Sequence, residues 1–123
     1  MARTTGSTTH RPNDPPVLIL TSLAGGPKHG HALSKDIEGF AGVVLGPGAL
    51  YGAITRLEER GLIEPLESED RRRPYRISTA GSAYLSEAVH EMQRLADEGA
   101  RRLAVANQVR APRRAPGIAG SPA

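Results

Sequence analysis

Two groups of side chains in this sequence have the chemistry for contacts to a nucleic-acid duplex. The first lies between residues 47 and 60, where Thr55 and Arg56 follow the small residues Gly48, Ala49 and Gly52. Threonine can hydrogen-bond a base or touch a thymine methyl group, and arginine can bind guanine or a phosphate. The second group is the run Arg71, Arg72 and Arg73, whose guanidinium groups suit phosphate oxygens or the minor groove. Both groups are candidate contacts to double-stranded DNA.

The stretch from 47 to 60 is expected to form a helix with one apolar side. Leu50, Ile54 and Leu57 recur at helical spacing, and Gly61 is the residue type that ends helices in the left-handed conformation. At about 100° per residue the opposite face is small and uncharged over its first two turns. Another surface can therefore approach closely, although an ordinary solvated helix face is the alternative. The candidate contact residues on or beside this face are Gly48, Ala49, Tyr51, Gly52, Thr55 and Arg56.

Tyr51 and the arginine run each allow a second interpretation. Tyr51 falls at the border of the buried face, so its hydroxyl could reach a phosphate or its ring could cap the core with the oxygen in water. The arginine run has three acidic neighbours, namely Glu67, Glu69 and Asp70. It could therefore be a charge-balanced, solvated turn rather than a phosphate contact.

Other chemistry has little support in this sequence. His29 and His31 are two residues apart, but a metal site needs three or four convergent ligands, so a capping or surface role is expected for them. There is no cysteine, no phosphate-binding loop, no activated Ser or Cys arrangement and no carboxylate pair placed for acid–base work. We expect neither an enzyme nor a cofactor.

The elements that position these residues follow from caps and periodicity. A nearly all-apolar helix is expected from 15 to 24, and a second helix turns Leu33, Ile37 and Phe40 inward. The candidate contact helix follows, and a hairpin then surrounds the arginine run. Thr79 is the expected N-cap of a last helix from 80 to 103. Helix, turn, helix and hairpin occur in the order of a winged helix.

The predicted fold class is mainly α with a small β-hairpin wing and a long C-terminal helix. The predicted organisation is a disordered arm over 1–13, a winged helix-turn-helix over 14–78, a dimerisation helix over 79–105 and a disordered Pro-, Gly- and Arg-rich tail over 106–123. Residues 15–103 hold 11 Lys and Arg against 12 Asp and Glu, so the pI of 9.8 comes from the flanks. No stretch is apolar enough to span a bilayer, and we expect a cytoplasmic protein.

The last helix carries an apolar stripe that predicts a homodimer. Aromatic residues make up only 3% of the chain, which is little for a self-contained core and favours burial against a second subunit. The first helix is expected to join this interface. The predicted dimerisation residues are Val17, Leu20, Tyr84, Leu85, Ala88, Val89, Met92, Leu95 and Ala96.

Four stretches of the chain resemble the PadR family of winged-helix transcriptional regulators. They are the opening from 17 to 37, the segment from Gly46 to Ile63, the strand from 73 to 77 and the helix entry from 79 to 81. The sequence departs from the family pattern at four positions, with His31 for Tyr, Gly46 for Ser, Ala49 for Thr and Gly52 for Pro.

The resemblance implies a homodimeric repressor with its third helix in the major groove and its wing on the DNA backbone. It also implies a two-fold symmetric operator and release by a small-molecule effector, whose identity the residues do not indicate. The alternative is a winged-helix module that binds proteins and has no specific affinity for DNA.

Overall fold

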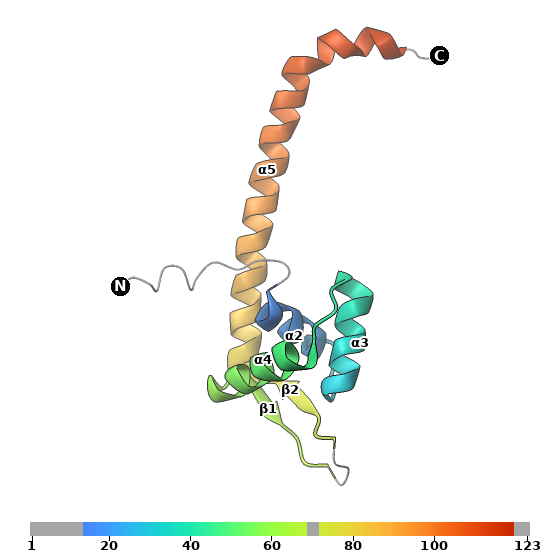
Figure 1. Cartoon of the computed structure of the whole chain (residues 1–123). Coiled ribbons are helices and arrows are strands. Elements are labelled where there is room, and N and C mark those ends of the chain that lie inside the picture. Colours follow the sequence, from blue (N-terminus) through green and yellow to red (C-terminus); the bar gives the residue numbers. More distant parts are fainter. Residues whose placement is uncertain (1–13, 69–71, 120–123) are drawn as a thin grey trace. The chain divides into compact units, whose positions relative to one another are not determined.

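The apolar helix near the N-terminus is the centre of the fold in this computed structural model, which describes residues 14–68 and 72–119. Three helices, a two-stranded hairpin and a last helix follow one another in the order predicted for a winged helix (Figure 1). In chain order the elements are α2 (Pro15–Ala24), α3 (Gly30–Ala41), α4 (Pro47–Glu59), β1 (Ile63–Pro65), β2 (Tyr75–Ile77) and α5 (Thr79–Ala119).

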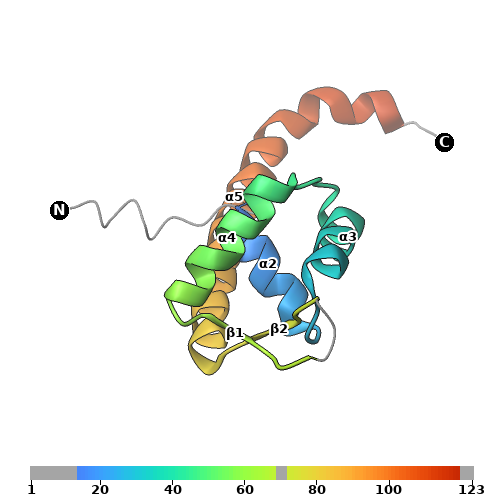
Figure 2. The same cartoon turned by 60° about the horizontal axis from the view of Figure 1, so that its bottom comes forward.

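Helix α2 is buried on several sides, as its composition predicts. Its residues from Val17 to Leu20 and Leu23 are all buried, and it contacts α3, α4 and β2. Figure 2 shows α2 between α3 and α4. Asp14 precedes the helix and prolines occupy its first turn, while Gly25 follows its last residue. The helix therefore has the predicted bounds.

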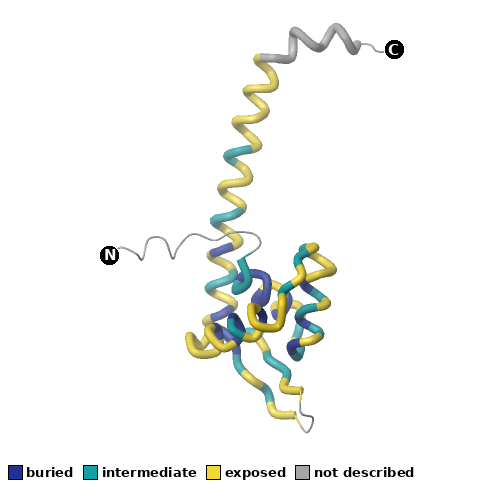
Figure 3. Tube along the Cα trace, in the orientation of Figure 1, coloured by how far each residue is buried: buried dark blue, intermediate teal, exposed yellow. Residues whose placement is uncertain are grey.

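Helices α3 and α4 each turn one apolar side toward α2, and buried positions gather there in Figure 3. Leu33 and Ile37 of α3 are buried as predicted. The inward placement of Phe40 is wrong, because its side chain is 48% exposed. Val43 and Leu45, in the loop after α3, pack against this edge of the core. The loop thus adds apolar contacts to the core, whereas Phe40 stays half exposed.

Gly61 ends the contact helix as the sequence predicts. Its φ is 75°, in the left-handed region that glycine adopts without a steric penalty. The main-chain N–H of Leu62 donates to the carbonyl of Leu57 at 2.9 Å, and that of Gly61 donates to Glu58 at 3.0 Å. This pair of bonds is the Schellman pattern of a helix C-terminus. It turns the chain from α4 directly into β1.

The wing is a short antiparallel pair in which Ile63 faces Ile77, Glu64 faces Arg76 and Pro65 faces Tyr75. A third segment joins its edge, because Lys28 and Tyr75 exchange two main-chain hydrogen bonds of 3.1 and 2.9 Å. Tyr75 is therefore held from both sides. The wing tip, including Arg71, lies outside the described residues.

Helix α5 begins one residue away from the predicted cap. Ser78, rather than Thr79, accepts a hydrogen bond from the N–H of Gly81 at 3.0 Å. Its hydroxyl also donates to the carbonyl of Gly61 at 2.6 Å, a partner that Thr79 does not have. A Cβ at Gly81 would collide with the Leu62 carbonyl and lie 2.9 Å from Ile77 Cγ1. The start of α5 is thus packed directly on the turn between α4 and β1.

The far end of α5 continues beyond its predicted limit. The helix extends to Ala119, although we expected it to end near Leu103 and the chain to be disordered from 106. Alanines at 100, 104 and 106 favour a helix, and Glu98 pairs with Arg101 and Arg102 at helical spacing. The chain divides into two compact units, residues 1–90 and 91–123, which are described separately here. The predicted boundary at 78/79 stays a prediction.

Within the described ranges 14–68 and 72–119, no helix is both long enough and apolar enough to cross a membrane.

Candidate nucleic-acid interface

The outer face of α4 is presented to solvent by the burial of its other side. Leu50, Ala53, Ile54 and Leu57 anchor the helix in the core. Opposite or beside them, Gly48, Ala49, Thr55 and Arg56 are exposed and Gly52 is half-buried. The candidate contact residues on α4 therefore lie outward as predicted, and four of the six have no side chain larger than that of threonine.

Thr55 has less freedom than its type suggests. Its hydroxyl donates to the carbonyl of Tyr51, one turn earlier, at 2.9 Å. The hydroxyl proton is therefore used within the helix, while the oxygen lone pairs and the methyl group remain available. Contact with a thymine methyl group, or acceptance of a hydrogen bond from a base, fits this geometry better than donation.

Arg56 lies over the position where Gly52 has no side chain. Its Nη1 atom is 3.6 Å from the point that a Cβ at Gly52 would occupy. The glycine thus leaves room for the arginine stem along the helix surface. From that position the guanidinium can extend toward a ligand that approaches the outer face of α4.

The ring of Tyr51 lies against the first residue of α3. A Cβ on Gly30 would come within 2.7 Å of Tyr51 Cζ and 2.8 Å of Cε1, so only glycine permits this contact without a shift. The ring nevertheless remains 50% exposed. The ring thus covers a helix junction and the hydroxyl faces a cavity, while its contact with a phosphate stays a prediction.

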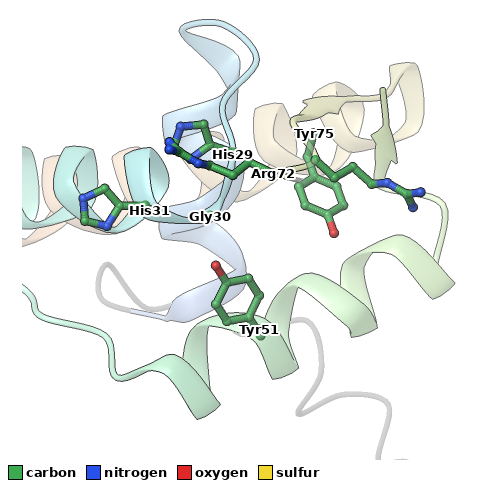
Figure 4. A pocket seen from close by; sticks show the side chains of 7 residues that line it. His29, Gly30, His31, Tyr51, Arg72 and Tyr75 are labelled. Atoms are coloured by element: carbon green, nitrogen blue, oxygen red, sulfur yellow. The ribbon is translucent and has the colours of Figure 1, made fainter. Parts of the chain in front are cut away.

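That cavity has a volume of about 340 Å³ and lies between the start of α3, the first half of α4 and the wing. Figure 4 shows the hydroxyl groups of Tyr51 and Tyr75 pointing into the space between α3 and α4. The cavity brings Tyr51 together with Arg72 and Arg73 of the arginine run, and the sequence did not predict this proximity. Its lining residues are His29, Gly30, His31, Tyr51, Arg72, Arg73 and Tyr75.

The lining of this cavity is rich in hydrogen-bond donors. Among the described residues that form it, none is acidic. Glu69, Asp70 and Arg71, which enter the charge balance of the wing, lie outside the described residues. Burial raises the pKa of the Tyr75 hydroxyl above its ordinary value of 10.0, and the carboxylate of Glu58 adds to the rise while Arg73 opposes it. The Tyr75 hydroxyl is thus protonated at neutral pH and can donate a hydrogen bond to a ligand.

His29 has the capping role that the sequence suggests. Its Nδ1 accepts a hydrogen bond from the main-chain N–H of Ala32 at 3.4 Å, at the N-terminus of α3. In the neutral ring this leaves the proton on Nε2. In the described part of the chain, no group of three or more His, Cys, Asp and Glu side chains is arranged to hold a metal ion.

Lys28 braces the turn beneath the cavity, a role that the sequence reading missed. Its ammonium group donates to the carbonyl of Ser22 at 2.6 Å and to that of Gly26 at 3.1 Å. The buried hydroxyl of Ser22 in turn donates to Asp36 at 2.6 Å, and Asp36 lies 3.9 Å from the ammonium. These bonds fix the α2–α3 turn, which also carries His29 and pairs with Tyr75.

The predicted dimerisation residues separate into buried and exposed groups. Val17 and Leu20 are buried within their own chain and have almost no surface left for a partner, because α2 fills the core of the first unit. Ala88 is also buried, and Tyr84 and Leu85 pack against that core. The exposed members are Val89 at the end of the first unit and, in the second unit, Leu95 and Ala96, with Met92 half-buried.

Comparison with known proteins identifies one family. The model described as "Transcriptional regulator PadR-like family" matches residues 19–87, more than half of the chain. A Streptomyces fradiae protein described as "Uncharacterized 37.1 kDa protein in transposon TN4556" is 47% identical over 85 residues, which cover 69% of this chain and 25% of that protein. The chain therefore spans about a quarter of the length of this relative.

Solved structures share the fold. A transcriptional regulator from Clostridium thermocellum, Cth-833, matches with a TM-score of 0.63 at 30% identity, over 71% of this chain and 89% of that one. A PadR-family regulator from Eggerthella lenta gives 0.61 at 27% identity, over 72% and 80% of the two chains. Another from Clostridium difficile gives 0.65 at 22% identity, over 72% and 96%, and shows the fold alone. These similarities confirm the predicted winged helix.

Proposed function

Because the chain belongs to the PadR-like family of transcriptional regulators, we propose that it is a repressor that binds a two-fold symmetric DNA operator as a homodimer. The observation that carries this proposal is the exposed outer face of α4, which combines small side chains with Thr55 and Arg56 and is held rigidly by the buried opposite face.

The outer face of α4 suits the major groove of DNA. Glycine and alanine at its N-terminal end permit close approach of the helix backbone to base edges. Thr55 and Arg56 then provide a methyl group, an acceptor and a guanidinium at the same face. We assign these two residues to sequence-dependent contacts, and Arg72 and Arg73 of the wing to the DNA backbone.

The dimer of this proposal uses the apolar stripe of α5. Val89, Leu95 and Ala96 are exposed in the single chain, and a second copy would cover them. A C2 dimer presents α4 twice, so its operator has two-fold symmetry with half-sites about one helical turn, or about 34–36 Å, apart. Repression follows where such an operator overlaps a promoter. Release by a small-molecule effector belongs to the same proposal.

Selection of genomic fragments with the purified protein tests this function. Fluorescence anisotropy on a selected duplex and on a scrambled duplex, across a salt series, gives the specificity and the number of phosphate contacts. We expect the selected duplex to bind more tightly and both affinities to fall as salt rises. Absence of salt-dependent binding to any duplex would contradict the proposal and favour a winged-helix module that binds proteins.

A further inference from the structure

The cavity between α3, α4 and the wing has the chemistry of a phosphate site. Two guanidinium groups, two phenol hydroxyls and two imidazoles line it, and none of the described lining residues is acidic. The carboxylate of Glu58 is close enough to act electrostatically on the Tyr75 hydroxyl but does not line the cavity. Arginine binds phosphate oxygens with parallel hydrogen bonds, and hydroxyl donors add short charge-assisted bonds. The first N–H groups of α3 also lack partners within the helix and favour an anion nearby.

Three parts of the cavity lining already have contacts within the chain. The ring of Tyr51 rests on Gly30, the main chain of Tyr75 is hydrogen-bonded to Lys28, and His29 caps α3. The Tyr75 hydroxyl, whose pKa is raised further above 10.0, can donate a hydrogen bond to an anion. The contacts of Tyr51, Tyr75 and His29 reduce the conformational entropy that the lining loses when an anion binds.

We propose that this cavity is a seat for one phosphate group, held jointly by Tyr51 of α4, Tyr75 and Arg72 of the wing and the start of α3. The proposal rests on the proposed DNA-binding function and names the backbone contact that joins the helix and the wing. In this proposal α4 and the wing bind the same phosphate group. Release of the wing from the DNA therefore also weakens the contact of α4 with that strand.

A phosphate diester of DNA is the source that the surroundings favour. The cavity opens between the two elements assigned to the duplex, and its volume of about 340 Å³ leaves room for the sugar beside the phosphate. A free phosphate or phosphomonoester has the same donor requirements and is the second source to be tested.

The experiment replaces single phosphates of the selected duplex by neutral methylphosphonates. It compares wild type with the double variant Tyr51→Phe/Arg72→Ala. Phenylalanine keeps the ring on Gly30 and removes only the hydroxyl, so the fold is preserved. Arg76→Ala is the matched control, because Arg76 lies on the same wing, pairs with Glu64 and does not line the cavity.

In wild type, one phosphate per half-site is expected to cost about tenfold in affinity when neutralised, the loss of one or two charge-assisted hydrogen bonds. The double variant binds the intact duplex more weakly and loses nothing further at that phosphate, whereas Arg76→Ala keeps the full loss there. If the double variant and wild type have the same profile over every phosphate, the seat is overturned while the DNA-binding function stands.

If wild type binds no duplex, the proposed function fails and inorganic phosphate becomes the probe. Saturable chemical-shift changes of the Tyr75 and His31 ring protons in wild type, absent in the double variant, which retains both residues, then support the seat with a free phosphate as its ligand. Identical, non-saturating changes in both proteins overturn it.

Discussion

The ring of Tyr51 in α4 packs against the side of Gly30 where a side chain would stand, and Gly30 is the first residue of α3. This contact helps to position α4, whose outer face is exposed. This contact joins α3 to α4 at the edge of the cavity. A substitution at Gly30 should therefore affect ligand binding more than the stability of the fold.

Gly30→Ala should leave stability almost unchanged and weaken DNA binding. The added methyl group displaces the Tyr51 ring, which is half exposed and can swing outward, so the backbone need not move. Alanine also favours the helix, and we expect the free energy of unfolding to change by less than about 1 kcal/mol. Urea denaturation and duplex anisotropy measure the two effects. Equal affinity for wild type and variant would show that the position of Tyr51 is irrelevant to binding.

Gly81→Ala should be far more harmful to the fold. Here the added methyl group meets the main-chain carbonyl of Leu62, which is held by a hydrogen bond from the N–H of Ser78, and the Cγ1 atom of Ile77. Overpacking of this kind costs about 1–3 kcal/mol. Thermal unfolding measures the loss, with Gly99→Ala as a control in the same helix, because nothing lies within 4 Å of its added methyl group.

Arg56 and the wing arginines should differ in how their loss depends on sequence. Arg56→Ala should cost about 1–3 kcal/mol on the selected duplex and little on a scrambled one, since a base contact is lost. Arg72→Ala/Arg73→Ala should weaken both duplexes and flatten the salt dependence by about one unit per lost phosphate contact. Equal weakening of both duplexes by Arg56→Ala would reassign Arg56 to the backbone.

Leu95→Asp should dissociate the proposed dimer. Leu95 is 74% exposed in the single chain, and burying such a side chain stabilises an interface by about 1.5–3 kcal/mol, counted twice in a homodimer. Analytical ultracentrifugation should show a shift toward monomer. Arg94→Asp introduces the same acid off the apolar stripe and should leave the mass unchanged. A wild type that is monomeric well above the concentrations used for DNA binding contradicts this interface.

The second unit should lose helicity in acid through Glu98. Hydrogen bonds from Arg101 and then Arg102 hold the pKa of this exposed carboxyl below its ordinary value of 4.5. Its contribution is therefore complete above pH 4.5 and is lost as the pH falls through the lowered pKa. Far-UV circular dichroism from pH 6 to about pH 2 follows the change. Glu98→Gln should remove this part of the acid transition, and an unchanged transition would assign it to other carboxyls.

Local signals account for most of what the sequence predicts correctly. Prolines in the first turn and Gly25 after the last residue define α2, and Gly61 defines the end of α4, because these residues act through their own backbone. The cap of α5 is different. Ser78 and Thr79 are both suitable types, and the choice depends on the carbonyl of Gly61, which is 17 residues away.

The cavity could not be read from the sequence for a similar reason. Its residues come from three separate segments, and Tyr75 joins His29 only because Lys28 adds its main chain to the wing edge. Val17 and Leu20 illustrate the opposite error. Their apolar character indicates burial, but composition alone does not say whether the covering surface belongs to the same chain. A thin aromatic content favoured a partner, whereas α3, α4 and the wing already provide the cover.

The hydroxyl of Ser78 has a mechanical consequence for regulation. One oxygen atom bonds both the turn that follows α4, through the carbonyl of Gly61, and the first turn of α5, through the N–H of Gly81. A ligand that tilts the start of α5 must therefore break these bonds or carry the end of α4 with it. A movement of the first turn of α5 would thus reach the end of α4 through one oxygen atom, without any contact at the residues that we propose for DNA binding.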